Sequence, residues 1–189
     1  WAGIEPYVDV LDHDRRWTCG KGVYADPVAE QALMLALAGL RGMGTYARAT
    51  TWEGPIGRNL LGARVVIVGG GGISESLVRL LKPFRCEIVV VRRTEQPFPG
   101  APRTVTLDRL DDELPDADLV VLAVALTPET EGLFDARRLR LLPNCFITPH
   151  VGNTPEMAVP LLSARVRENV RRYLAGEELL GPVDVDAGY

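Results

Sequence analysis

The stretch that decides the fold reads Arg64-Val65-Val66-Ile67-Val68-Gly69-Gly70-Gly71-Gly72-Ile73-Ser74. An apolar, β-branched strand pattern runs directly into a glycine cluster, and an amphipathic segment follows. A strand that turns tightly into a helix lets backbone N–H groups and the positive helix end face a pyrophosphate. The last position of Gly69-x-Gly71-x-x-Ser74 departs from the dinucleotide fingerprint, which has Gly or Ala there. Serine is small enough to serve, so we expect a dinucleotide, rather than a plain tight turn, at Gly69, Gly71, Gly72 and Ile73.

From Arg64 onward, short apolar strands alternate with helical stretches. This alternation predicts parallel strands joined by right-handed crossovers, the pattern of a doubly wound α/β sheet. Strands are expected at 64–69, 86–91, 103–107, 118–124 and 145–148. Helices are expected at 72–82, 108–114, 135–142 and 155–175, the last capped by Thr154. The proline-rich stretch 95–102 is expected to be a surface loop.

Upstream of this pattern, Asp26 and Pro27 predict a helix start, with Asp as the cap and Pro at the first helical position. The helix should run to about Arg41, before a long loop from 42 to 62. Its apolar residues cover most of its circumference, so it needs partners on more than one side. We therefore expect a homodimer with this helix in the interface. Residues 1–22 are expected to be irregular, with a short apolar run at 7–11 and a short strand around 17–19.

Composition narrows the class of protein. Hydrophobic content of 47% and charged content of 24% are those of an ordinary globular chain. A net charge of −4 gives no general attraction for nucleic acid or anionic lipid, and the longest apolar run, Ala32 to Leu40, cannot span a bilayer. Three separated cysteines indicate neither a disulfide framework nor a zinc site. Cys86 and Cys145 are expected to be buried free thiols. No secretory leader pattern is evident, so a cytoplasmic protein without a metal is expected.

The second strand ends in Arg92-Arg93-Thr94. An NAD site usually has an acidic residue at this point, where it binds the ribose 2′-OH. Two guanidinium groups and a hydroxyl suit a 2′-phosphate instead, because Arg binds phosphate through paired charge-assisted hydrogen bonds. The alternative is that both arginines are merely solvated. We favour NADP over NAD.

Two later strand ends offer further candidates. Ala125, Leu126 and Thr127 follow the strand at 118–124, and this turn either flanks the nicotinamide or is a simple loop with a helix cap. His150 follows the strand at 145–148, where a histidine is well placed for acid–base chemistry near neutral pH. In isolation, a hydrogen-bonded loop histidine is the simpler interpretation. His13 lies in a polar run and is expected to be solvated.

Several ordered segments resemble the D-isomer-specific 2-hydroxyacid dehydrogenase family. Leu126-Thr127-Pro128-Glu129-Thr130 resembles its turn beside the cofactor, and Thr148-Pro149-His150-Val151-Gly152 its catalytic-histidine segment. Segments 23–32 and 60–69 resemble its helix leading into the cofactor domain and its first strand. The ending Gly181-Pro182-Val183-Asp184, together with Arg92, is most similar to the glyoxylate/hydroxypyruvate reductase branch.

The resemblance implies a Rossmann-type cofactor domain at 23–153 and remnants of a substrate-binding domain at 1–22 and 154–189. It also implies hydride transfer between NAD(P)H and a small 2-keto or D-2-hydroxy acid. His150 would donate the proton to the keto oxygen, and the backbone of Ala2 and Gly3 would hold the substrate carboxylate.

Two parts of the family pattern have no counterpart. The catalytic Arg and the Glu that pairs with the histidine should lie between Leu142 and Cys145, where only Pro143 and Asn144 stand. The first half of the substrate domain, expected before Trp1, is also missing from the sequence. We therefore expect this chain to turn over poorly. A non-catalytic dinucleotide-sensing protein on the same fold is the alternative.

Overall fold

The computed structural model describes residues 4–52, 54–142, 145, 148 and 151–186 of the 189-residue chain. Its centre is a parallel sheet of β1 (Arg64–Val68), β2 (Glu87–Val91), β3 (Arg103–Val105) and β4 (Leu119–Leu122). The strand order is β3-β2-β1-β4. The chain thus moves outward from β1 through β2 to β3 and then crosses back to pair β4 with the other side of β1. The expected doubly wound α/β sheet is confirmed.

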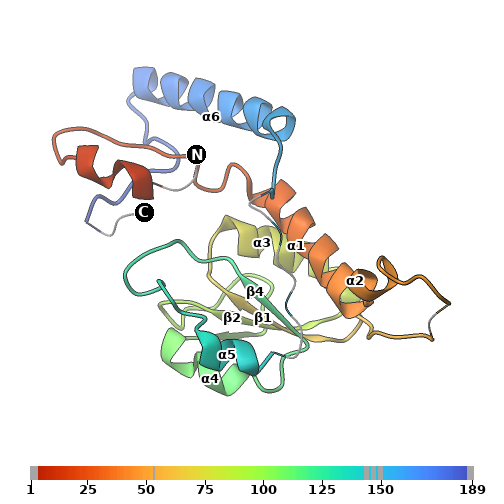
Figure 1. Cartoon of the computed structure of the whole chain (residues 1–189). Helices are drawn as coiled ribbons and strands as arrows, with labels where there is room; N and C mark the ends of the chain where they lie inside the picture. Colours follow the sequence, from red (N-terminus) through yellow and green to blue (C-terminus); the bar gives the residue numbers. More distant parts are fainter. Residues whose placement is uncertain (1–3, 53, 143–144, 146–147, 149–150, 187–189) are drawn as a thin grey trace.

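Side chains of β1 alternate between two layers of core. Val65 and Ile67 face the cluster formed with α3 (Gly72–Leu81), while Val66 and Val68 face Leu110 and Leu114. The first layer also includes α1 (Ala25–Leu40), which packs on α3. Figure 1 shows α1 and α3 on one side of the sheet, with α4 (Leu110–Glu113) and α5 (Ala136–Arg140) on the other. All four apolar residues of β1 are fully buried, as expected for a central parallel strand.

The two ends of the chain meet away from the sheet. A 3₁₀ helix, η1 (Glu5–Val10), opens the described part, and the long helix α6 (Pro155–Ala175) lies near its end. Thr18 forms an antiparallel bridge with Pro182, and the Cys19 N–H donates to the Gly181 carbonyl over 2.9 Å. The Arg165 side chain donates to the Lys21 carbonyl over 3.1 Å. The N- and C-terminal segments therefore form one structural unit.

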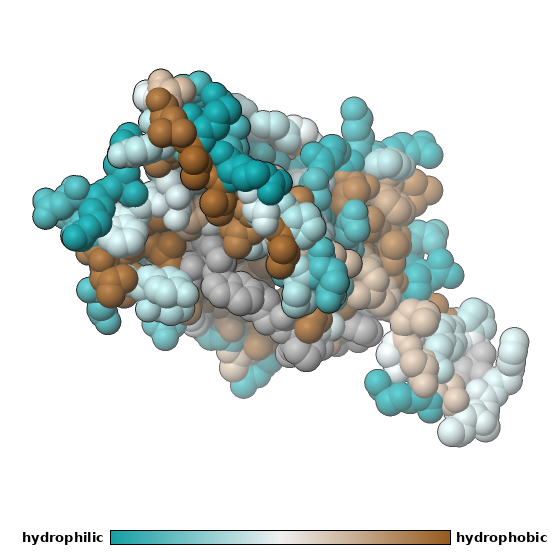
Figure 2. Space-filling view, turned by 90° about the horizontal axis from the view of Figure 1, so that it is seen from above, coloured by the Kyte–Doolittle hydropathy of each residue, from teal (hydrophilic) through white to brown (hydrophobic). Residues whose placement is uncertain are grey.

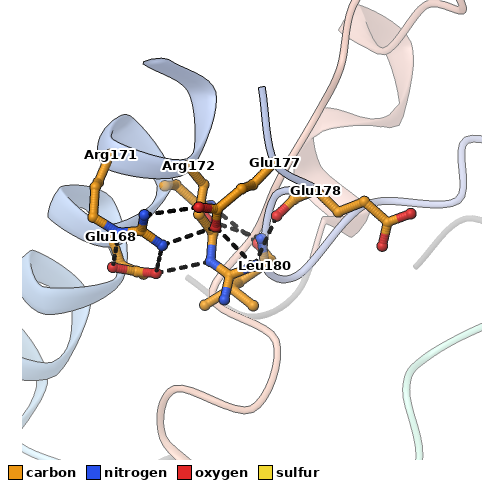
Figure 3. A network of polar contacts seen from close by, with 7 residues as sticks. Glu168, Arg171, Arg172, Glu177, Glu178 and Leu180 are labelled. Atoms are coloured by element: carbon orange, nitrogen blue, oxygen red, sulfur yellow. Dashed lines mark hydrogen bonds and ion pairs between the residues drawn. The ribbon is translucent and has the colours of Figure 1, made fainter. Parts of the chain in front are cut away.

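An ionic network closes the C-terminal end of α6 (Figure 3). Arg171 binds both Glu168 and Glu177, and Arg172 binds Glu168 over 2.8 Å and the Glu178 carbonyl over 3.0 Å. Hydrogen bonds from Arg171 and then Arg172 lower the pKa of Glu168 to about 2. The network ties the end of the helix to the chain that follows it.

The outer face of α6 is apolar. None of its described residues is buried, and Figure 2 shows a hydrophobic stripe over this helix. Exposed members of the helix include Val159, Val166, Val170, Tyr173 and Leu174. In the described part of the chain, no helix is both long and apolar enough to cross a membrane.

Most of the predicted strands and helices are present in the structure, although several begin or end a few residues away from the predicted positions. The helix expected at 108–114 is a 3₁₀ turn, η3 (Leu107–Arg109), continued by α4, and another 3₁₀ turn, η2 (Lys82–Phe84), extends α3. Thr154 is the N-cap residue of α6, as predicted. The fifth expected strand, at 145–148, falls largely outside the described residues.

Four local expectations were wrong. Asp26 does not cap α1, whose N-cap residue is Tyr24, because the Asp26 carboxylate binds Ser76 and Arg79 on α3, each over 2.6 Å. The expected loop from 42 to 62 contains a short helix, α2 (Met43–Tyr46), and most of the apolar run at 7–11 lies in η1. Cys145 is exposed, and Cys86 is half-buried rather than buried, as is Cys19.

Candidate functional site: the carboxyl edge of the sheet

The glycine turn directly follows β1. In the sheet, β2 and β3 lie on one side of β1 and β4 lies on the other, so β1 borders the switch point of the strand order. Gly69 donates to Val91 of β2, and Ala123, just after β4, donates to Val68, each over 2.8 Å. The ends of three strands therefore meet at this edge. Ligands of doubly wound sheets bind at such a switch point, outside the carboxyl ends of the strands.

The local conformation of this turn requires glycine at its first position. Gly69 has φ +117, and a Cβ there would lie 2.3 Å from the Ala123 carbonyl oxygen. At Gly71, the N-cap residue of α3, a Cβ would meet no heavy atom within 4 Å. Gly71 therefore borders open space at the N-terminus of a ten-residue helix, and its N–H groups and dipole suit a phosphate.

Ser74 occupies the last position of the fingerprint, where Gly or Ala is usual. Its side chain is fully buried, and its hydroxyl donates to the Gly69 carbonyl over 2.8 Å. A Cβ at Gly72 would come within 3.3 Å of Gly22 Cα and 3.4 Å of Ala25 Cβ, so α1 approaches the turn closely. The Ser74 hydroxyl therefore holds the glycine turn to the first residues of α3.

Arg92, Arg93 and Thr94 follow β2, and Arg92 lies beside this turn. The Arg92 N–H extends the β2–β3 pairing by donating to Val105 over 2.9 Å. A Cβ on Gly70 would lie 3.1 Å from both Cδ and Nε of Arg92, so the arginine side chain lies on the glycine turn. Arg93 and Thr94 are exposed. Of the three predicted cofactor residues, Arg92 thus contacts the glycine turn, and Arg93 and Thr94 follow it in the chain.

The turn after β4 is closed by one hydroxyl. Thr130 Oγ1 donates to the Ala125 carbonyl over 2.6 Å and accepts from the Thr127 N–H over 2.8 Å. A hydrogen bond from Thr127, with a smaller contribution from the charge of Arg93, holds the pKa of Glu129 below its usual value. Ala125 and Leu126 are exposed at this edge.

Three predicted residues cannot be placed. His150, the predicted proton donor, and the substrate-binding Ala2 and Gly3 lie outside the described residues. His13 is exposed, with Nε2 3.4 Å from Asp186 Oδ1. Within the described ranges, no group of His, Cys, Asp and Glu side chains could hold a metal ion.

Sequence reasoning missed two features near the sheet. Glu113 is almost fully buried and binds Arg64 and Arg103, the first residues of β1 and β3, so it lies at the edge opposite the glycine turn. Phe98, in the expected surface loop, is only 3% exposed and lies under Arg92. The Pro99-Gly100 pair after Phe98 signals a tight turn that could anchor it, whereas no local pattern marks Glu113.

A cavity among the described residues lies away from this edge. It has about 580 Å³ and is lined by residues 12–18 and 178–186 of the two chain ends. Its wall carries both acidic and basic side chains. It includes none of the strand ends described above.

Residues 31–145 match the sequence model of the D-isomer specific 2-hydroxyacid dehydrogenase NAD binding domain. The match covers more than half of the chain and includes the turn, both flanking strand ends and the β4 loop. This chain belongs to the D-isomer specific 2-hydroxyacid dehydrogenase family. An NAD(P)-linked dehydrogenase fold is thereby established.

Curated relatives cover the chain unevenly. A glyoxylate reductase from Thermococcus kodakarensis is 27% identical over 91% of this chain but only 55% of its own length. The chain thus spans about half of this relative. An uncharacterized protein from Corynebacterium melassecola is 28% identical, and the alignment covers all of this chain and 81% of that protein. This alignment runs over 247 positions, more than the 189 residues here, so the relative has residues within it that lack a counterpart.

Solved structures share the fold. A D-isomer specific 2-hydroxyacid dehydrogenase from Xanthobacter autotrophicus, in complex with NADPH and MES, superposes with a TM-score of 0.80 at 23% identity, over 99% of this chain and 100% of that chain. An NADPH-dependent glyoxylate/hydroxypyruvate reductase from Sinorhizobium meliloti, in complex with NADP and sulfate, gives 0.81 at 18% identity, over 100% and 78%.

Proposed function

We propose that this chain binds a nicotinamide dinucleotide, NADPH in preference to NADH, for hydride transfer to a small 2-keto acid of the glyoxylate or hydroxypyruvate class. The observation that carries the proposal is the Gly69–Ser74 turn at the switch point, with the Arg92 side chain lying on it. Guanidinium groups follow β2 where a carboxylate would favour NADH. The open space at Gly71 and the N-terminus of α3 fit a pyrophosphate.

Each group of residues has a distinct role in this proposal. Gly69, Gly71, Gly72 and Ile73 present backbone N–H groups and clear space for the pyrophosphate, while Arg92, Arg93 and Thr94 receive the 2′-phosphate. Ala125, Leu126 and Thr127 border the other side of the crevice. The dinucleotide, when bound, supplies the hydride. His150 donates a proton to the keto oxygen, and the backbone of Ala2 and Gly3 holds the carboxylate.

The proposal assigns 23–153 to the dinucleotide domain and 1–22 with 154–189 to the substrate-binding side. The bridge between Thr18 and Pro182 supports the joining of the two ends. The chain should turn over poorly, because it has neither the Arg that orients the keto acid nor the Glu that stabilises a histidine cation. The alignment with the Corynebacterium relative supports only the point that residues present in that protein have no counterpart here.

Titration and turnover assays test the proposal together. NADPH and NADH are titrated by calorimetry, and NADPH oxidation is followed with glyoxylate and hydroxypyruvate. The assay compares the 189-residue chain, a version with an internal Arg- and Glu-bearing family segment, and His150→Ala in that version. We expect tighter NADPH binding and faster turnover by the longer version, lost in His150→Ala. Binding without turnover in either version would favour the dinucleotide-sensing alternative, and tighter NADH binding would refute the cofactor assignment.

A homodimer through α1 is part of the proposal. Only Ala29 and Ala36 of α1 are buried within the chain, while Met34 and Leu37 remain exposed. Burial of these side chains in a twofold interface would complete the second side of the helix. Sedimentation should show a dimer that Leu37→Glu dissociates, and a stable wild-type monomer would refute this. We also propose a cytoplasmic location, which fractionation of cells tests.

A further inference from the structure

We infer that Phe98 is a positioning residue that sets the preference for a 2′-phosphate by holding the Arg92 guanidinium beside the glycine turn. The inference rests on the proposed binding of the dinucleotide at this turn. Phe98 itself is buried, so it acts through Arg92.

The geometry fixes Arg92 at two points. Its Cζ lies 5.9 Å from the centroid of the Phe98 ring, within the range of a cation–π interaction. Its Cδ and Nε lie against Gly70, where an added Cβ would be 3.1 Å away. An aromatic ring and the glycine turn thus restrict the stem and the head of the same side chain.

Phe98 is itself held firmly. Its carbonyl accepts from the Ala101 N–H over 3.1 Å, closing a turn with Pro99 and Gly100, and Gly100 has φ +79. Its own N–H donates to Thr104 Oγ1 on β3 over 3.2 Å. The ring belongs to the core layer formed by α3 and β1. Phe98 is therefore a rigid part of the sheet layer rather than of a surface loop.

A preorganised guanidinium loses less conformational freedom when it binds a phosphate. A planar fork held beside the turn also favours paired hydrogen bonds to a phosphate. Arg93, the next residue in the chain, is exposed. The contact with the Phe98 ring therefore makes the position of Arg92 depend on an aromatic side chain.

Two nucleotides that differ only in the 2′-phosphate isolate this effect. Calorimetry measures the affinities of 2′,5′-ADP and 5′-AMP for wild type, Phe98→Leu, Phe98→Met, Phe98→Trp, Arg92→Leu and Val78→Ala. The ratio of the two dissociation constants is the readout, because general loss of stability affects both nucleotides alike. Val78→Ala is the matched control, since Val78 belongs to the same core layer as Phe98.

We expect wild type to prefer 2′,5′-ADP, and Arg92→Leu to abolish the preference. Phe98→Leu and Phe98→Met should each reduce it about tenfold, the size of a strong cation–π contribution. Phe98→Trp should restore it, and Val78→Ala should keep it. A wild-type ratio retained by both non-aromatic variants, while Arg92→Leu loses it, would overturn the inference alone. No preference in wild type would overturn the proposed NADPH assignment, and the inference with it.

Discussion

Glu113→Gln should destabilise the fold far more than Glu87→Gln, although both carboxylates bind Arg64. Glu113 is 2% exposed and accepts from Arg64 and from Arg103, the latter over 2.7 Å, whereas Glu87 is 59% exposed. In the variant, an amide NH₂ replaces one carboxylate oxygen and faces a guanidinium. The Nε of Arg64 is also buried and has no hydrogen-bond partner among the described residues. Loss of the Glu113 carboxylate would therefore leave a second buried polar group of Arg64 without a good acceptor.

The magnitude follows from burial. Removing one partner of a buried ion pair costs about 3–5 kcal/mol. Arg103 is 54% exposed and can be rehydrated, so the lower end of this range, about 3 kcal/mol, applies. For a chain of this size that corresponds to a fall in Tm of about 6–12 °C. Glu87→Gln, which removes an exposed pair, should cost below about 1 kcal/mol.

Urea unfolding followed by circular dichroism, with both variants at the same protein concentration, measures the difference. Equal m-values would show that the two free energies are comparable. Losses of the same small size in Glu113→Gln and Glu87→Gln would refute the conclusion that the buried carboxylate holds the two strand starts together.

Gly69→Ala should lower the free energy of unfolding by several kcal/mol, since its Cβ would collide with the Ala123 carbonyl at a positive φ. Gly71→Ala should leave stability nearly unchanged but weaken NADPH binding at least tenfold, because its methyl would enter the open space at the helix N-terminus; thermal melts and calorimetry separate the two, and intact NADPH affinity in Gly71→Ala would contradict the site. Glu168, with its pKa lowered from 4.5 to about 2, stabilises the end of α6 above about pH 4.5, and this contribution is lost as the pH falls toward 2. Carboxyl NMR titration measures that pKa, and a midpoint near 4.5 would contradict the network of Figure 3.

Local patterns predicted the central fold well. β1, the glycine turn and α6 follow from short-range rules of strand burial, tight turns and helix starts, and their positions agree with those rules. The same rules failed for Asp26, because its carboxylate is engaged by Ser76, fifty residues away in the sequence, rather than by its own helix. A capping preference near 1 kcal/mol is easily overridden by such a tertiary hydrogen bond.

The supporting residues of the site were harder to predict. Phe98 lies in a proline-rich loop, and only the tertiary packing under α3 shows why an aromatic residue stands there. Glu113 binds guanidinium groups from β1 and β3, which the sheet brings together from distant parts of the sequence. Strand ends that carry candidate binding residues can be predicted from a sequence. The contacts that orient those residues depend on how the layers of the fold pack together.

Amide hydrogen exchange with and without saturating NADPH tests the central claim most directly. Binding at the carboxyl edge should slow exchange at residues 70–74, with a further effect at 92–94 and 125–127. The cavity between residues 12–18 and 178–186 should be unaffected. Unchanged exchange at 70–74, or protection confined to that cavity, would contradict the assignment of the glycine turn as the dinucleotide site.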